Sequence, residues 1–246
     1  MSQPHSLVIG GTRGIGQAIV CDFVRENHLV SVIGRRPPLT STLSDSTVKY
    51  WAADLVEPDG LARALDEVVQ QRGSIQNLVF CQRYRGDGDN WQGELEVTLN
   101  ATHYVVDRLS ASLAKQGNGA MVFVGSLLSS FVASSQGASY HVAKAAALQL
   151  MRYYAVALAP NVRSNVVTPG LVLKEEAREY YTQNQALHDL LKRITPLARM
   201  ACPRDVADAV SFLCSPRASF ITGQELIVDG GLSLELAQSL AMRLTS

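Results

Sequence analysis

The chain has 246 residues, of which 47% are hydrophobic and 18% are charged, and its 22 basic residues balance its 22 acidic residues. This length suffices for one large hydrophobic core, and the even spread of apolar residues favours a single domain over residues 1–246. The balanced charge excludes the strongly basic surface that binds nucleic acid or an anionic membrane.

The cysteines and the amino-terminal residues indicate the compartment. Cys21, Cys81, Cys202 and Cys214 are scattered, without a Cys-x-x-Cys pair or paired histidines, which argues for free thiols and against a metal site. Residues 1–6 lack the basic segment and separate apolar core of a signal peptide. No apolar run approaches membrane-spanning length. We expect a soluble, cytoplasmic protein that binds no metal, nucleic acid or membrane.

A glycine-rich loop follows the first expected strand, residues 6–9, and precedes a helix expected over residues 17–25. This order of strand, loop and helix is typical of a dinucleotide site. Glycine allows a tight turn and a close approach of the backbone to a pyrophosphate, whose charge suits a helix N-terminus. A plain turn is the less favoured alternative. The loop residues expected to bind are Gly10, Thr12, Arg13, Gly14, Ile15 and Gly16.

The second expected strand, residues 29–33, ends in Gly34, Arg35 and Arg36. Sites that select NAD usually place an acidic residue here to bond the ribose hydroxyls, whereas a 2′-phosphate needs a cation. No acidic residue occurs at this point, and Arg13 adds a further cation from the glycine loop. The sequence therefore predicts NADP(H) as the cofactor.

Asp54 and Leu55 follow the third expected strand, residues 48–52. The Asp54 carboxylate could accept a hydrogen bond from an adenine amino group, or it could cap the next helix, expected over residues 61–71. The local sequence does not decide between these. The fourth strand, residues 75–80, leads into a polar segment that includes Cys81. A long helix within residues 91–113 then carries Asn100, although asparagine inside a helix normally faces water.

The fifth expected strand, residues 119–125, places Ser126 at its carboxyl end, where open parallel sheets bind ligands. A helix running from about Tyr140 to residue 159, ended by Pro160, follows. Tyr140 and Lys144 lie four residues apart, so they share one face of this helix. A nearby ammonium favours the phenolate, so the pair could exchange a proton with a carbonyl or alcohol oxygen. Spacing alone would favour an ordinary surface pair, and the other motifs reverse that preference.

The sixth expected strand, residues 162–167, ends in Thr168, Pro169 and Gly170, a rigid turn against which a flat ring could rest. Residues 171–195 are charged and helical in pattern, which is typical of a lid over a substrate. A helix over residues 205–213 and a seventh strand over residues 223–229 follow. The alternation of strands and helices predicts one doubly wound α/β Rossmann domain, with a mostly parallel seven-stranded sheet and helices on both faces.

The tail, residues 232–246, has leucines at intervals of four, which predicts one apolar helical face that covers a neighbouring subunit or the chain's own substrate cleft. These leucines are Leu232, Leu236, Leu240 and Leu244.

From residue 7 to residue 231, these motifs resemble the short-chain dehydrogenase/reductase family, in the single-domain form that includes 3-oxoacyl-carrier-protein reductases. The resemblance rests on an ordered set and not on any one match. Its members are Gly10, Gly14, Gly16, Asp54, Asn100, Ser126, Tyr140, Lys144, Asn165, Pro169, Gly170 and the segments 196–199 and 223–231.

The resemblance implies an NADP(H)-dependent oxidoreductase that interconverts a carbonyl and a secondary alcohol, assembled as a homotetramer or homodimer through the Asn100 and Tyr140 helices. Tyr140 would donate or accept the proton, Lys144 would hold the nicotinamide ribose, Ser126 would orient the carbonyl and Asn100 would hold a water. The implied cofactor-binding residues are Gly10, Thr12, Arg13, Gly14, Ile15, Gly16, Arg35, Arg36, Asp54, Leu55, Cys81, Tyr140, Lys144, Pro169, Gly170 and Val172.

The chain departs from the family pattern in three places. Phe80, Cys81, Gln82 and Arg83 replace the usual Asn-Asn-Ala-Gly, Lys174 replaces a threonine, and Ser126 lies one residue further from the tyrosine, so that the intervening loop must bulge. The first change makes a catalytically weakened dinucleotide-binding scaffold or sensor the alternative function. Arg83, Arg85 and Lys174 suggest a site entrance that favours a carboxylate or phosphate on the substrate, with solvated surface charges as the alternative.

Overall fold

The computed structural model describes residues 3–38, 45–86, 89–115 and 117–245. Seven strands pair in the order β3-β2-β1-β4-β5-β6-β7, and each neighbouring pair is parallel, which confirms the predicted doubly wound sheet. The strands are β1 (His5–Ile9), β2 (Leu29–Gly34), β3 (Val48–Ala52), β4 (Asn77–Phe80), β5 (Gly119–Val124), β6 (Val162–Pro169) and β7 (Glu225–Val228).

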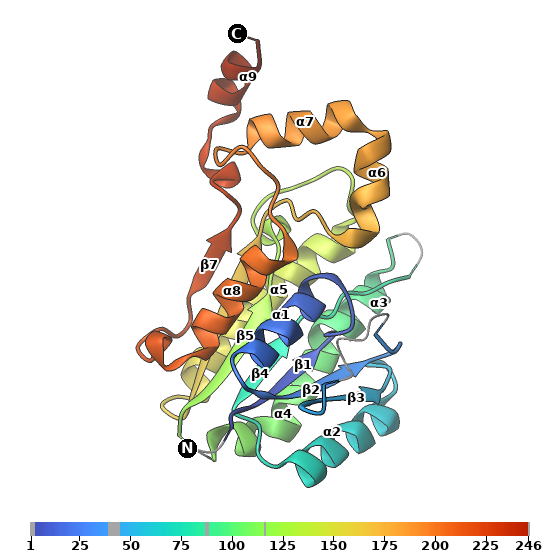
Figure 1. Ribbon diagram of the computed structural model, residues 1–246, viewed down its shortest axis with the longest axis vertical. Helices are drawn as coiled ribbons and strands as arrows, with labels where there is room; N and C mark the ends of the chain where they lie inside the picture. The colour runs from blue at the N-terminus through green and yellow to red at the C-terminus, as the bar shows by residue number, and fades with distance from the viewer. Residues whose placement is uncertain (1–2, 39–44, 87–88, 116, 246) are drawn as a thin grey trace.

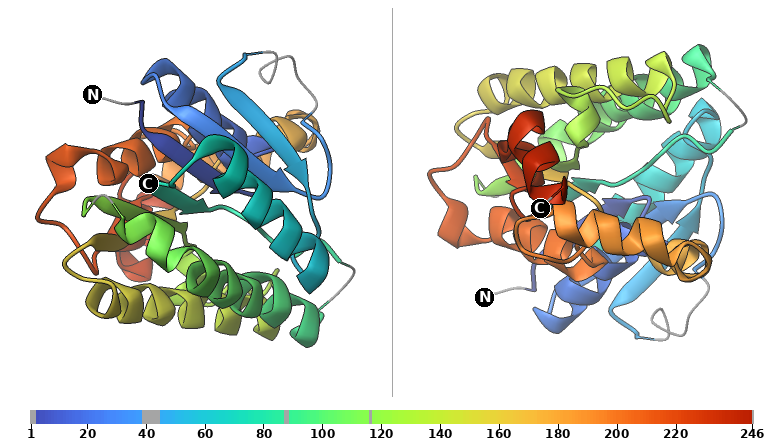
Figure 2. Two further views of the ribbon diagram at one scale, coloured as in Figure 1. Left: turned by 90° about the horizontal axis from the view of Figure 1, so that it is seen from below. Right: turned by 90° about the horizontal axis from the view of Figure 1, so that it is seen from above.

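Helices cover both faces of the sheet. In Figure 2, α1 (Gly14–Arg25) and α8 (Pro203–Cys214) lie on one face, and α2 (Pro58–Arg72), α4 (Ala101–Ala114) and α5 (Ala138–Ala157) lie on the other. Alternate strand residues enter two separate cores, as their opposite side-chain directions require. For example, Leu7 belongs to the core beneath α2, α4 and α5, whereas Val8 belongs to the core beneath α1 and α8. Because both faces are covered, the central strands carry continuous apolar runs, such as residues 7–9, 78–80 and 120–124.

The order of the strands reverses between β1 and β4, since β1 pairs with β2 on one side and with β4 on the other. The register aligns the carboxyl ends of neighbouring strands, with Ile9 beside both Ile33 and Phe80. Loops that leave these strands therefore emerge together at one edge of the sheet, at the point where doubly wound folds bind ligands.

The predicted lid segment lies beyond this edge. It folds into a short 3₁₀ turn (Glu175–Ala177) followed by α6 (Arg178–Gln183) and α7 (Gln185–Ile194). Figure 1 shows α6 and α7 above the sheet, with α9 (Ala237–Thr245) beside α7. No residue of α6 or α7 is fully buried, so these helices cover the sheet edge without joining either core.

The prediction of one leucine face along the tail is wrong. Only Leu240 and Leu244 lie in α9, because the chain is extended at Glu235 and Leu236 is exposed. The Asp229 carboxylate accepts hydrogen bonds from Gly231 N and Ser233 N, and this turn directs the chain into a separate 3₁₀ helix (Leu232–Leu234). The helical period is therefore interrupted before α9 begins.

Within the described part of the chain, no helix has the length and apolar character that a membrane span requires. All four cysteines are free thiols.

Candidate active site

Loops from the carboxyl edge of the sheet line a cleft of about 1020 Å³. Ser126, Tyr140 and Lys144 all line it. So does every residue predicted to bind a dinucleotide: Gly10, Thr12, Arg13, Gly14, Ile15, Gly16, Arg35, Arg36, Asp54, Leu55, Cys81, Tyr140, Lys144, Pro169, Gly170 and Val172. The strand ends therefore bring the glycine loop and the candidate proton-transfer pair to a single cleft.

The glycine loop fits closely between β1, α1 and the segment after β4. Gly10 has a φ of +81°, which favours glycine, and a Cβ at this position would lie 2.8 Å from Gln82 N. A Cβ at Gly16 would lie 2.2 Å from Gly10 O. The N-cap residue of α1, Arg13, makes no side-chain hydrogen bond to the first turn. The backbone N–H groups at the start of α1 thus suit a phosphate ligand, as the fit of a dinucleotide requires.

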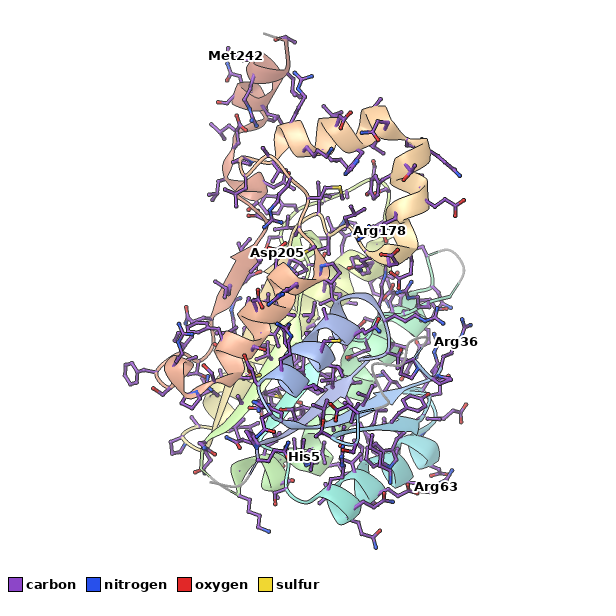
Figure 3. The ribbon with its side chains drawn as sticks, in the orientation of Figure 1. His5, Arg36, Arg63, Arg178, Asp205 and Met242 are labelled. Atoms are coloured by element: carbon purple, nitrogen blue, oxygen red, sulfur yellow. The ribbon has the colours of Figure 1, made fainter. Side chains whose placement is uncertain are left out.

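Two basic residues follow the end of β2, and Asp54 follows the end of β3. Arg35 Nη1 lies 4.0 Å from Asp54 Oδ2, and half of the Arg35 side chain is exposed. Arg36 is also exposed (Figure 3). Asp54 accepts a hydrogen bond from Val56 N, while the N-cap of α2 is Glu57. Asp54 therefore faces the cleft and forms a turn before α2 without capping that helix.

The first turn of α5, which precedes Tyr140, is held by a residue from another segment. Asp89 accepts hydrogen bonds from Ala138 N at 3.0 Å and Ser139 N at 3.1 Å, and it also accepts one from Ser139 Oγ. These bonds, led by the one from the Ser139 hydroxyl, lower the pKa of Asp89. A carboxylate at this end also complements the helix dipole. Asp89 therefore fixes the position from which Tyr140 enters the cleft.

Lys144 is buried below Tyr140, with 8% of its surface exposed. Its Nζ lies 5.9 Å from the centroid of the Tyr140 ring and donates a hydrogen bond to Val124 O at 3.2 Å. This contact holds the ammonium between α5 and the end of β5. Because an ammonium has three donors, Lys144 retains the capacity to bind further acceptors.

Ser126 leaves the end of β5 and begins a 3₁₀ turn (Leu127–Ser129). Its Oγ accepts a hydrogen bond from Leu128 N at 3.2 Å. The hydroxyl therefore occupies a defined position beside the cleft that Tyr140 also lines.

The structure does not bring Asn100 to this group. The helix between Trp91 and Ala114 contains a π-helical turn (Glu96–Asn100). Asn100 is exposed at the end of this turn and does not line the cleft. Thr98, which is 4% exposed, instead lines a second cavity of about 20 Å³ together with Gln82 and Lys144. Asn100 therefore does not line the cleft with Ser126, Tyr140 and Lys144, because it is exposed at the end of the π-helical turn.

The helical spacing of the buried residues around Asn100 indicates Thr98 as the residue on the inward face. Thr98, Thr102, Val105 and Leu109 fall at intervals of four, three and four residues and are all buried, so they form the inward face of this helix. Gln82 bonds to the same face, since its Nε2 donates to Thr102 Oγ1 at 2.8 Å. The residue two positions after Thr98 necessarily falls outside this face.

Three further cations, Arg83, Arg85 and Lys174, line the same cleft. The Arg83 guanidinium carbon lies 5.2 Å from the centroid of the Tyr140 ring, and Arg83 Nη2 donates to Gln136 Oε1 at 3.4 Å. Lys174 lies over the glycine loop, because a Cβ at Gly14 would be 3.5 Å from Lys174 Cδ. Burial, together with the charges of Arg83 and Arg85, lowers the pKa of Lys174. Cys81, between these groups, has its pKa raised to about 11 by burial.

The model of a known protein family, described as enoyl-(acyl carrier protein) reductase, matches residues 10–233. The A-factor type gamma-butyrolactone 1'-reductase of Streptomyces virginiae is 29% identical over 93% of this chain and 95% of its own. The 3-oxoacyl-[acyl-carrier-protein] reductase MabA of Mycobacterium tuberculosis is 29% identical over 93% of this chain and 92% of its own.

Solved structures agree with the fold over nearly the whole chain. The aldohexose dehydrogenase of Thermoplasma acidophilum superposes with a TM-score of 0.87 at 26% identity, covering 96% of both chains. A short-chain type dehydrogenase/reductase from Mycobacterium ulcerans superposes with a TM-score of 0.84 at 29% identity, covering 96% of this chain and 92% of the other.

Proposed function

The chain belongs to the short-chain dehydrogenase/reductase family, and we propose that it is an NADP(H)-dependent oxidoreductase that interconverts a carbonyl and a secondary alcohol. The observation that supports this most is the meeting of Ser126, Tyr140 and Lys144 with the glycine loop in one cleft. The names of two relatives describe reductases, which favours carbonyl reduction as the working direction.

In the proposed reaction, the Tyr140 hydroxyl donates a proton to the substrate oxygen during reduction and accepts one during oxidation. Ser126 Oγ donates a hydrogen bond to the same oxygen and orients it. Lys144 places a positive charge 5.9 Å from the phenol ring, which favours the phenolate when the proton leaves. With Asn100 exposed, we assign only these three side chains to proton transfer.

NADP(H) fits the remaining groups of the cleft. The glycine loop and the start of α1 would hold the pyrophosphate, and Arg35 and Arg36 would hold the 2′-phosphate. Asp54 and Leu55 line the cleft and would contact the adenine. Cys81, Pro169, Gly170 and Val172 would enclose the nicotinamide end, and Lys144 would bond its ribose. Hydride exchange is the chemistry that the bound nicotinamide supplies.

We extend the proposal to the lid, the cellular compartment and the assembly of the protein. We assign residues 171–195 as a substrate lid, since α6 and α7 lie beyond the sheet edge without joining a core. We place the protein in the cytoplasm, in keeping with its four free cysteines. We propose assembly as a homotetramer or homodimer through the α4 and α5 helices.

The test is Tyr140→Phe, which removes the exchangeable proton and leaves the ring. We expect kcat for carbonyl reduction with NADPH to fall by about 10²- to 10⁴-fold, the usual share of acid–base catalysis, while the Kd for NADPH changes little. Steady-state kinetics and NADPH fluorescence titration measure the two quantities. Equal rates for variant and parent would refute the proposed mechanism. NADPH binding by the parent without turnover of any carbonyl class would favour the scaffold or sensor.

A further inference from the structure

We infer that the substrate carries an anionic group, a carboxylate or a phosphate, which binds to Arg83 with support from Arg85 and Lys174 beside Tyr140. This inference rests on the proposed function, because it names the class of substrate that the same cleft takes. A carboxylate and a phosphate share the negative oxygens that a guanidinium binds through paired N–H donors.

Arg83 lies where it can reach a group attached to the reacting carbon. Its guanidinium carbon is 5.2 Å from the centroid of the ring whose hydroxyl is proposed to transfer the proton. A guanidinium has five N–H donors, and the hydrogen bond to Gln136 occupies one of them at 3.4 Å. A cation stacked on the phenol adds charge at the substrate side of the cleft, away from the 2′-phosphate site at Arg35 and Arg36.

In the described part of the chain, acidic groups lie near this cluster without pairing with it: the Glu176 carboxylate lies beside Lys174 over Gly14, and the charge of Arg83 acts on Glu94. Among the residues that the structure describes, neither Arg83, Arg85 nor Lys174 forms an ion pair with a carboxylate. The charged groups that act on Lys174 include both arginines, which repel it. Arg83 and Arg85 are exposed and Lys174 is partly buried, and an anion bound between these like charges would offset their repulsion.

Lys174 and Arg83 lie beside different parts of the cleft, so we assign them different ligands. Lys174 extends over Gly14 in the glycine loop, where it can also meet a cofactor phosphate, whereas Arg83 stacks on Tyr140. We therefore assign Arg83 as the direct ligand of the substrate anion and Lys174 as a cation placed between the substrate and the pyrophosphate. The roles predict different responses: Arg83 variants change only substrate affinity, while Lys174 variants change both affinities.

The experiment compares matched probes: a keto acid with its methyl ester, and dihydroxyacetone phosphate with dihydroxyacetone. Calorimetry measures their binding to the parent enzyme saturated with NADP⁺, so the readout needs no turnover. We expect at least one anion to bind about tenfold or more tightly than its neutral partner, and we expect added salt to weaken only the anion. Equal binding of both members in each pair would overturn the inference even if the enzyme reduces carbonyls.

Variants then assign the preference to Arg83. Arg83→Ala should remove the difference between anion and neutral probe, Arg83→Lys should restore part of it, and both should keep the parent Kd for NADPH. Arg63→Ala is the control, since Arg63 is an exposed cation on α2, far from the lid (Figure 3). A preference that survives Arg83→Ala, or a loss that follows only from weaker NADPH binding, would overturn the assignment. Loss of turnover with intact anion binding would instead count against the proposed function.

Discussion

Arg35 and Arg36 follow β2 directly, at the edge where the strand order reverses, and both side chains are largely open to solvent. Arg35 lies 4.0 Å from Asp54, so its charge is only partly offset. An exposed pair of cations at this point can bind a phosphate without first breaking a buried ion pair, which would be costly. The choice of cofactor therefore rests on individual side chains and not on the shape of the fold.

Arg35→Asp is expected to reverse that choice. The new carboxylate would repel a 2′-phosphate and could accept hydrogen bonds from ribose hydroxyls. Losing a charge-assisted hydrogen bond corresponds to roughly 1.5–3 kcal/mol, so the Kd for NADPH should rise by about ten- to a hundredfold. The Kd for NADH should stay equal or fall. Fluorescence titration with both nucleotides measures this, and a variant that still prefers NADPH would contradict the assignment.

The position of a single site residue can be predicted from the sequence where that residue directly follows the end of a strand. Ser126 and the glycine loop could be placed because parallel strands deliver their carboxyl ends to one edge, and Tyr140 and Lys144 because four residues make about one helical turn. Asn100 could not be placed by matching motif order, because a shift of two residues on a helix moves a side chain to the opposite face. The π-helical turn at that point has no simple sequence signature.

The elements themselves depend on contacts made at their ends, as α8 illustrates. Arg199 donates two hydrogen bonds of 2.7 Å to the Asp205 carboxylate, which also accepts one from Cys202 N at the start of the helix (Figure 3). These donors, with Arg199 first, hold the pKa of Asp205 well below its usual range. The folded protein therefore binds fewer protons at this carboxyl than the unfolded chain does in acid.

Asp205→Ala should thus destabilise the fold by about 0.5–2 kcal/mol at neutral pH, because Asp205 is the third helical residue of α8 and its carboxylate accepts the hydrogen bond from the N-cap residue Cys202. A depressed folded-state pKa contributes stability that is fully present above the unfolded pKa, near 3.9, and is lost as pH falls from there through the lower folded-state pKa. The difference in the free energy of unfolding between parent and variant should accordingly become smaller as the pH falls. Urea denaturation at several pH values gives both free energies of unfolding, and a difference that stays constant down to the lowest pH would contradict this cause.

Whether a segment forms a strand or a helix could be predicted because apolar runs and helical periods extend over many residues. The residues at which each strand or helix begins and ends depend on local hydrogen bonds. Strand β4 begins at Asn77 and not at residue 75, where Ile75 N bonds to Ser112 Oγ. The tail was mispredicted because a leucine every fourth residue does not reveal the turn that Asp229 forms. Such a turn depends on the hydrogen bonds of one carboxylate, which a periodic pattern does not report.

In a single chain of this protein, apolar side chains on α5 are exposed to solvent. Tyr153 is 62% exposed and Val156 is 81% exposed, on the outer side of the helix that carries Tyr140. Exposed apolar groups gathered on one helix are typical of a surface that meets another subunit. This agrees with the proposed assembly through α4 and α5.

The double variant Tyr153→Glu and Val156→Glu should reduce the mass measured by size-exclusion light scattering to that of a smaller assembly, because it would bury like charges at a shared interface. Far-ultraviolet circular dichroism should not change, since both positions face solvent within a single chain. Arg63→Glu, which changes an exposed residue on α2, should leave the mass unaltered. A parent protein that already runs at 26.6 kDa would refute the proposed assembly.

Asp89 joins two parts of the chain that have different tasks. It belongs to the same connection after β4 as Arg83, yet its carboxylate bonds to the backbone of α5 immediately before Tyr140. We therefore expect that exchanging this connection for that of a relative would alter both substrate affinity and the rate, even where every proton-transfer residue is retained.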